Sequence, residues 1–218
     1  LHGPDPLRPE VRHEPGLDGV RGIAVALVVV HHIVVRVEEP AISGGWLGVD
    51  LFFVLSGFLI TASMLANPDL GDFLRRRFWR IVPAMVVFLA AYVVWSVGAS
   101  DAQQRLEWAF AALTQWANIQ GAIGPPFSEH IGHLWSLSAE VQFYVVWGAC
   151  LWWLLRRGVS RPVILAVPVA LFLLSWAERV LLLRSGSIWN RLYLGPDTRA
   201  AGLLVGCVLF VAAVYWSG

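Results

Sequence analysis

Three ionisable side chains lie inside long apolar stretches, where such groups are costly and are functional candidates by default. His31 and His32 fall in the stretch Val20–Val37, and Glu140 falls in the stretch Leu134–Leu155. Adjacent residues on a helix point about 100° apart, so at most one of the two imidazoles should face a given cavity. A histidine and a carboxylate that share a wet cavity can act together as a general base. The residue types therefore predict proton-transfer chemistry within a membrane.

Other polar side chains lie close to these positions in the sequence. Asp50 is in the second apolar stretch, and Ser136 precedes Glu140 by four residues, so the two share a helix face. We interpret Asp50 and Ser136 as candidates for lining the cavity. Gly48 and Gly57 leave room for another backbone or a ligand, and we assign them mainly to helix packing.

A cluster of arginines precedes the apolar stretch Ile81–Gly98 and consists of Arg75, Arg76, Arg77 and Arg80. Guanidinium groups pair well with phosphate oxygens, so the cluster can bind a phosphorylated ligand. It can equally mark the cytoplasmic side of a membrane and contact anionic lipids. The sequence leaves both interpretations open.

The first apolar stretch begins close to Asp18 and Arg21. Asp18 is of the type that caps a helix by accepting its first free N–H groups, and the sequence leaves open whether it has this structural role or a chemical one. Arg21 lies at the entrance of the helix, where a long cationic side chain can reach the interface as an anchor.

The composition indicates that these stretches belong to a membrane protein. The chain is 57% hydrophobic and only 14% charged, whereas soluble domains carry about 25% charged residues. It contains 12 tryptophans, a residue that favours the membrane–water interface. The net charge of +1 implies no nucleic-acid partner. Cys150 and Cys207 both lie in apolar runs, and we interpret them as packed thiols rather than parts of a disulfide or metal framework.

We predict an all-α, polytopic bundle with six spans and one interfacial or re-entrant helix. The expected spans are Val20–Val37, Trp46–Ala66, Ile81–Gly98, Leu134–Leu155, Pro162–Leu183 and Arg199–Trp216, and the additional helix is Arg105–Ile119, which could also span. Because arginines collect in cytoplasmic loops, we place the arginine cluster and the N-terminus in the cytoplasm. Arg156, Arg157 and Arg161 fall on that side only if Arg105–Ile119 does not cross. Residues 1–16 then form a flexible cytoplasmic tail.

This topology places three ionisable groups at similar depth. At about 1.5 Å per residue, His32 lies ~18 Å from the cytoplasmic start of its helix. Glu140 and Asp50 lie ~9 Å and ~6 Å from the outer end of theirs. In a hydrocarbon core of about 30 Å, all three reach the outer half of the membrane.

The chain resembles the acyltransferase type 3 family of membrane proteins. Four blocks match in order, namely Leu17–His32, Gly45–Ile60, Arg75–Pro83 and the block His133–Tyr144, which is similar to His-x-Trp-Ser-Leu-x-x-Glu-x-x-Phe-Tyr. In the first block, ten residues separate Arg21 from His32, which is the spacing of the family's essential arginine and histidine, so the resemblance selects His32 over His31. A fifth, weaker match contains Thr198 and Arg199, but Ala201 replaces an acid that is usual there.

The resemblance implies a donor, an acceptor and a set of roles. The donor would be an acyl-coenzyme A, most often acetyl-CoA, and the acceptor a carbohydrate hydroxyl. Membrane lipids are a further expected partner, and the sequence does not define the oligomeric state. The implied catalytic residues are His32, as general base or acyl carrier, and Glu140, which orients or charges the imidazole. The implied donor site consists of Arg21, Arg75, Arg76, Arg77 and Arg80, and the implied cavity of Asp50, Ser136, His133 and Arg199. No metal is implied.

Two other classes of protein remain possible from the sequence. A transporter or channel could use the histidine and glutamate as a proton relay. A non-catalytic membrane scaffold would need them only for stability. Because the family has more membrane helices than are visible here, we expect the acyltransferase domain, residues 17–218, to be incomplete at its C-terminus, the alternative being a shortened paralogue.

Overall fold

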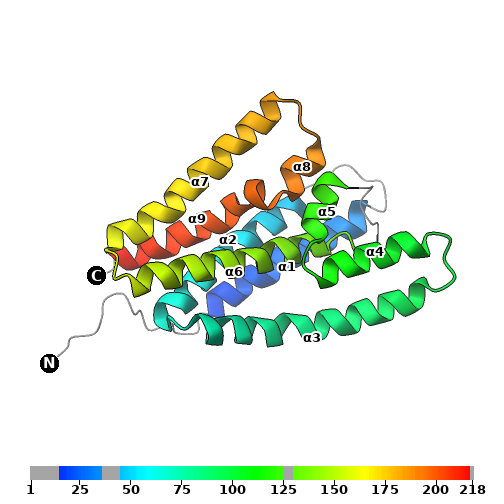
Figure 1. Ribbon diagram of the computed structural model, residues 1–218, viewed down its shortest axis with the longest axis horizontal. Helices are drawn as coiled ribbons and strands as arrows, with labels where there is room; N and C mark the ends of the chain where they lie inside the picture. The colour runs from blue at the N-terminus through cyan, green and yellow to red at the C-terminus, as the bar shows by residue number, and fades with distance from the viewer. Residues whose placement is uncertain (1–14, 36–44, 125–129, 217–218) are drawn as a thin grey trace. The chain divides into compact units, whose positions relative to one another are not determined.

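The computed structural model of the chain describes residues 15–35, 45–124 and 130–216 (Figure 1). Every regular element in these residues is an α-helix, which confirms the predicted all-α class for this part of the chain. The helices are α1 Pro15–Val35, α2 Gly45–Ala66, α3 Leu70–Ser96, α4 Ala102–Leu113, α5 Ala117–Ile123, α6 Leu134–Arg156, α7 Arg161–Arg184, α8 Trp189–Leu194 and α9 Pro196–Trp216.

Four helical segments are long and apolar enough to cross a membrane, namely Leu47–Ala66, Leu70–Ser96, Arg161–Arg184 and Trp189–Val214. Helices α1 and α6 have 21 and 23 residues. At about 1.5 Å per residue both are also as long as the ~30 Å hydrocarbon core. The chain is therefore a helical membrane protein.

The helices form two compact units. The first unit comprises residues 1–68, 153–172 and 201–218, and the second unit comprises residues 69–152 and 173–200. The second unit contains most of the residues that the sequence assigns to chemistry, whereas the first contains the helix that carries His32.

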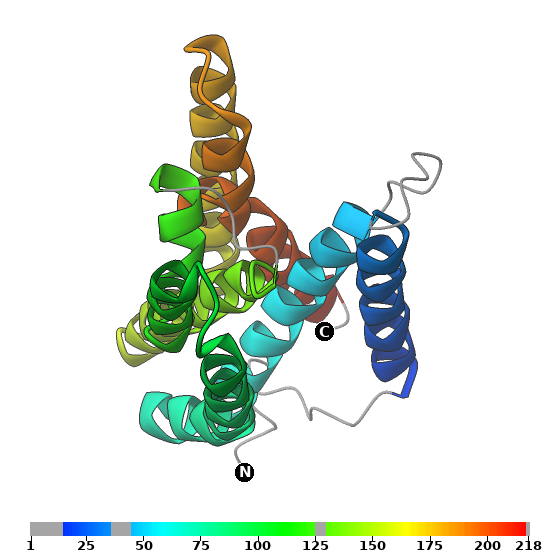
Figure 2. The same ribbon diagram turned by 90° about the vertical axis from the view of Figure 1, so that its right-hand side faces the viewer.

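In the first unit, α2 contacts its neighbours through glycines, and Figure 2 shows α1 and α2 side by side. A Cβ atom at Gly48 would lie 2.7 Å from the carbonyl oxygen of Ala24 in α1. A Cβ atom at Gly57 would lie 1.8 Å from the carbonyl oxygen of Leu203 in α9, and one at Gly206 would lie 1.9 Å from a carbonyl oxygen of α2. No larger side chain fits, so the packing role predicted for Gly48 and Gly57 is confirmed.

In the second unit, α3 and α6 run antiparallel. Near the start of α3, the ring of Phe73 lies 6.4 Å from that of Tyr144 in α6. Further along α3, Phe88 lies 6.1 Å from the ring of His133, just before α6 begins. Helix α4 packs against α3 around a buried core of Met85, Leu89, Tyr92, Trp108, Ala109, Ala111, Ala112, Ala117 and Ile131. The burial of these apolar groups holds the unit together.

The stretch Arg105–Ile119 does not form the single helix that the sequence predicts. Helix α4 ends at Leu113, and α5 begins at Ala117 after a turn. In this turn Gln115 has a φ of 59°, the only positive φ among the non-glycine residues that the structure describes. The 12 residues of α4 cover about 18 Å, which is too short to cross a membrane.

A pair of amides from α5 and α6 fixes this turn. The side-chain nitrogen of Gln142 donates to the backbone carbonyl of Gln115 at 2.6 Å and to Oδ1 of Asn118 at 2.9 Å. Asn118 returns a hydrogen bond to Oε1 of Gln142 at 3.0 Å. Asn118 is fully buried, so these bonds satisfy amide groups that no water reaches.

Two helices begin earlier than the apolar pattern predicts. Helix α3 begins at Leu70 rather than Ile81, because Asp69 caps it and accepts a hydrogen bond from the backbone N–H of Asp72 at 2.8 Å. The arginine cluster therefore lies in a helix and not in a loop.

Helix α1 likewise begins at Pro15, so Asp18 lies in its first turn rather than before it, and its capping role stays a prediction. A proline suits the first position of a helix, where its missing N–H is not needed. The Asp18 carboxylate lies 3.8 Å from Nη1 of Arg21. Most of the predicted tail, residues 1–14, lies outside the described residues.

Candidate active site

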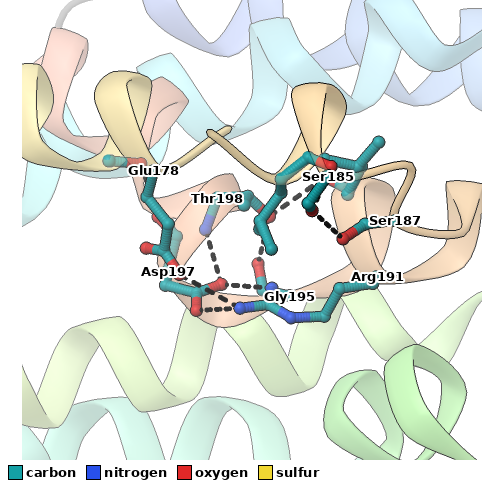
Figure 3. Close-up of polar contacts among 10 residues, drawn as sticks. Glu178, Ser185, Ser187, Arg191, Gly195, Asp197 and Thr198 are labelled. Atoms are coloured by element: carbon teal, nitrogen blue, oxygen red, sulfur yellow. Dashed lines mark hydrogen bonds and ion pairs between the residues drawn. The ribbon is translucent and has the colours of Figure 1, made fainter. Parts of the chain in front are cut away.

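Three charged side chains meet where α7, α8 and α9 come together in the second unit (Figure 3). The guanidinium of Arg191 donates two hydrogen bonds to Asp197, from Nη1 to Oδ1 at 2.7 Å and from Nη2 to Oδ2 at 2.5 Å. The same Nη2 donates to Oε1 of Glu178 at 3.1 Å. One cation thus holds two carboxylates through bidentate and charge-assisted bonds. We call these three residues the Arg191 cluster.

The backbone around the Arg191 cluster is fitted closely to it. A Cβ atom at Gly195 would lie 2.8 Å from the backbone carbonyl oxygen of Arg191 and would also displace the side chains of Arg191 and Asp197, so only glycine fits. Oδ1 of Asp197 also accepts from the backbone N–H of Thr198 at 2.8 Å, in the first turn of α9, where a negative charge is favourable. Ser175 of α7 donates to the carbonyl of Asp197. The cluster therefore joins three helices.

Two residues beyond Asp197, Arg199 is buried among aromatic rings. Its guanidinium carbon lies 4.0 Å from the ring centroid of Tyr193 and 5.3 Å from that of Trp135. Its Nε donates to the carbonyl of Tyr193 at 2.8 Å. The rings of Trp135 and Tyr193 are 5.1 Å apart, so α6 meets α8 and α9 at this point. Cation–π contacts of this kind fix the plane of the guanidinium.

The sequence-predicted residues of α6 lie at the same end of this helix. Glu140 is only 3% exposed, so the acid is buried within the protein. Ser136 turns its hydroxyl back to the carbonyl of His133 at 3.1 Å, which gives it a role at the helix start. His133 immediately precedes α6, and Ser136 and Glu140 lie in its first two turns, as does Trp135, whose ring contacts Arg199.

Three of the predicted site residues, His32, Asp50 and Arg21, belong to the first unit. His32 is part of α1 by its backbone, but its side chain lies outside the described part of the chain. Asp50 is half-buried on α2, and Arg21 is half-buried beside Asp18 in α1. Because Glu140 belongs to the other unit, the joint action of Glu140 with these residues stays a prediction.

The arginine cluster divides into paired and unpaired side chains. Arg75 donates to Oδ1 of Asp72 at 2.7 Å, and Arg76 forms an ion pair with the same carboxylate. Arg77 lies over two aromatic rings, and Arg80 is exposed. Neither Arg77 nor Arg80 forms an ion pair with any residue in the described ranges.

The arginine cluster and the start of α6 lie far apart along α3. Phe88, which contacts His133, lies eleven positions beyond Arg77 on α3. At 1.5 Å per residue this is about 17 Å. The second unit therefore carries cations near the N-terminal end of α3. The contact between Trp135 and Arg199, near the first turn of α6, lies toward the other end of α3.

Sequence reasoning missed the Arg191 cluster. Glu178 interrupts the apolar stretch Pro162–Leu183, and the cost of an acid in a membrane span, which singled out Glu140, applies to it equally. The sequence does not single out Arg191 and Asp197 in this way, because they lie in a short polar segment between apolar stretches. Only the folded structure shows that they lie next to Glu178. Among the residues that the structure describes, no three His, Cys, Asp or Glu side chains gather as a metal site.

The apolar helices, the buried acid on α6 and the Arg191 cluster define a helical membrane protein with a polar site where four helices meet. The sequence profile described as an acyltransferase domain matches residues 14–218. The chain belongs to this family of acyl-transferring enzymes, which confirms the resemblance noted from its motifs.

The names of two proteins of similar sequence agree with the assignment to the acyltransferase family. The chain is 33% identical over 215 residues to the peptidoglycan O-acetyltransferase OatA of Listeria monocytogenes, which covers 91% of this chain and 34% of that protein. It is 33% identical over 220 residues to the O-acetyltransferase OatA of Staphylococcus aureus, with coverage of 91% and 34%. The chain thus spans about a third of the length of these curated relatives. No solved structure matches the chain.

Proposed function

We propose that the protein is a membrane O-acyltransferase that moves an acetyl group from acetyl-CoA to a carbohydrate hydroxyl. The family supports acyl transfer, and the names of the two relatives support an acetyl group and a peptidoglycan-like acceptor. The observation that carries the proposal is the separation of charge in the second unit. Arginines suited to a phosphorylated donor and the start of α6, where Trp135 contacts Arg199, lie about 17 Å apart along α3.

The donor's phosphates bind at the arginine cluster, with Arg21 as a further partner. Arg80 makes the first contact, because it is exposed and forms no ion pair with a described residue. Arg75 and Arg76 share the single carboxylate of Asp72, so two guanidinium groups are opposed by one negative charge. The surface remains cationic, and forked guanidinium groups bind phosphate oxygens in pairs.

The acceptor carbohydrate binds beside Arg199, Trp135 and Tyr193. A sugar presents apolar C–H faces, which pack on aromatic rings, and hydroxyl groups, which need hydrogen-bond partners. The stacked guanidinium and the carboxylates of the Arg191 cluster offer both kinds of contact. His133, Ser136 and Asp50 complete the cavity as secondary members.

His32 accepts the proton of the acceptor hydroxyl, and Glu140 orients or charges its imidazole, as an acid does in hydrolase triads. The hydroxyl oxygen attacks the thioester carbonyl, the C–O bond forms and the C–S bond breaks. Coenzyme A leaves as the thiol with the proton that His32 had taken up. A covalent acyl-histidine stage would divide the same overall transfer into two steps.

The domain, residues 17–218, is multi-pass, with six crossings by α1, α2, α3, α6, α7 and α9 and a cytoplasmic N-terminus. The hairpin of α4 and α5 is re-entrant, because α4 is too short to cross. In a variant without Cys150 and Cys207, cysteines placed at Ser100 and Ser185 should react from the outer face of oriented vesicles. A cysteine at Ser160 should react only from the cytoplasmic face.

Acetyl transfer from radiolabelled acetyl-CoA to peptidoglycan fragments tests the function in membranes that contain the full protein. His32→Ala should lower the rate by 10²- to 10⁴-fold, the range for loss of a general base. His31→Ala is the matched control and should retain the rate. Equal rates for His32→Ala and the wild type would remove His32 from the mechanism. Absent transfer by the wild type, with proton flux across the vesicles, would favour a transporter.

A further inference from the structure

An apolar groove of about 500 Å³ runs between α3 and α6 in the second unit. Phe78 and Ile81 form its α3 wall, Val141 and Val145 form its α6 wall, and the end of α4 closes it. A volume of this size is typical of a small-molecule site. The side chains of Phe78 and Val145 are 52% and 48% exposed, so the groove opens to the exterior of the chain along an apolar membrane helix.

One end of the groove is cationic. Arg75 and Arg77 both line it, but Asp72 already pairs with Arg75. The guanidinium of Arg77 lies 5.5 Å from the ring centroid of Phe73 and 5.0 Å from that of Tyr144, so two rings hold it at the groove. No carboxylate in the described residues neutralises Arg77. The groove therefore has apolar walls and, at one end, a positive charge that aromatic rings hold in place.

The polarity of the walls decides which ligand fits. Apart from the arginines, Gln115 and Tyr144 are the polar side chains in the lining, and the side-chain nitrogen of Gln115 already donates to Sδ of Met85 and to the carbonyl of Ala112. A ligand with amides along its length, such as the pantetheine arm of coenzyme A, would leave most of them without partners, which is costly. A hydrocarbon chain needs no partners and gains from burial.

We propose that this groove binds an anionic phospholipid, with one acyl chain between α3 and α6 and the phosphate at Arg77. A basic side chain at the end of an intramembrane groove is suited to a lipid headgroup. The groove shares Arg75 and Arg77 with the arginine cluster, whereas Arg76 and Arg80 lie outside its lining, so the lipid uses Arg77 and the donor makes its first contact at Arg80. The inference does not depend on the proposed catalytic residues.

Lipid retention by the purified full chain tests the site. The protein is placed in nanodiscs of phosphatidylcholine with a minor fraction of phosphatidylglycerol, and the lipid that stays bound on release is counted by native mass spectrometry. Arg77→Gln should lower bound phosphatidylglycerol about tenfold, as expected for loss of one charge-assisted contact. The matched control Arg80→Gln, on the same helix but outside the groove, should retain it.

A second variant tests the acyl chain. Val145→Trp fills the groove from a half-exposed position, so the fold tolerates the larger ring, and it should also lower retention. A phosphatidylglycerol with a photoreactive acyl chain should label peptides of α3 and α6 in the wild type only. Equal losses in Arg77→Gln and Arg80→Gln, no loss in Val145→Trp, or displacement of the lipid by acetyl-CoA would each overturn the proposal.

Discussion

The Arg191 cluster gives a sharp test of the site, because one guanidinium holds two carboxylates. Replacing Arg191 by glutamine removes three charge-assisted hydrogen bonds and leaves Glu178 and Asp197 facing each other. Both carboxylates then lose their counterion and repel each other. The variant should therefore be less stable than the loss of one hydrogen bond would suggest.

The size of the effect follows from the three bonds and their exposure. At 1.5–3 kcal/mol for a hydrogen bond to a charged group, three buried bonds would contribute roughly 4–9 kcal/mol. The side chains of Arg191, Asp197 and Glu178 are 24%, 37% and 39% exposed, so solvent screens part of this. We expect a loss of about 3 kcal/mol. For a chain of this size that corresponds to a fall in Tm of about 6–12 °C.

Thermal unfolding of the detergent-purified protein, followed with a thiol-reactive dye, measures this fall, because Cys207 is fully buried until the protein unfolds. Adding Glu178→Gln to Arg191→Gln should recover part of the loss by removing the repulsion. Arg184→Gln, at an exposed position in the last turn of α7, is the control and should leave Tm unchanged. Equal Tm values for Arg191→Gln and Arg184→Gln would refute the structural role of the cluster.

Three further predictions concern other parts of the chain. Gly57→Val should abolish the monodisperse detergent-extracted protein, because its Cβ would overlap a carbonyl oxygen of α9 that no rotamer change can move. Gln142→Leu should cost about 2 kcal/mol by leaving the buried amide of Asn118 unsatisfied, and adding Asn118→Leu should restore part of the Tm. The hydrogen bond from Arg105 lowers the pKa of Asp101, so its stabilising effect is present above the ordinary aspartate pKa and is lost as pH falls through the lowered value. Arg105→Gln should raise that pKa in an NMR titration, and an unchanged pKa would contradict the assigned cause.

Much of the fold is predictable from hydropathy, because burying a backbone in lipid leaves few alternatives to a helix. The segments Leu47–Ala66 and Arg161–Arg184 agree with the predicted spans to within one residue. The start of α3 was not predicted, because its arginines lower the mean hydropathy of its first turns. The structure shows that the helix nevertheless begins there, with Asp69 as its N-cap. That cap is readable from the sequence Asn-Pro-Asp, which places an N-cap residue after a proline.

The α4–α5 hairpin and the Arg191 cluster are two features that could not be predicted from the sequence. The turn at Gln115 has no glycine or proline to signal it, and it is fixed by Gln142, which is distant in sequence. The Arg191–Asp197 pair is likewise a product of helices meeting at Gly195. Composition identifies costly polar residues such as Glu140 and Glu178, but it cannot tell which partner each will have.

The central claim is that the donor and the acceptor are recognised at separate ends of the second unit, and steady-state kinetics of acetyl transfer test it most directly. Arg80→Gln should raise the KM for acetyl-CoA by about ten- to a hundredfold, as expected for loss of a charge-assisted contact, and leave the KM for the acceptor unchanged. Arg199→Gln should raise the KM for the acceptor and leave that for acetyl-CoA unchanged. If both variants change the KM for the same substrate, or if neither variant changes either KM, the assignment of the two ends is wrong.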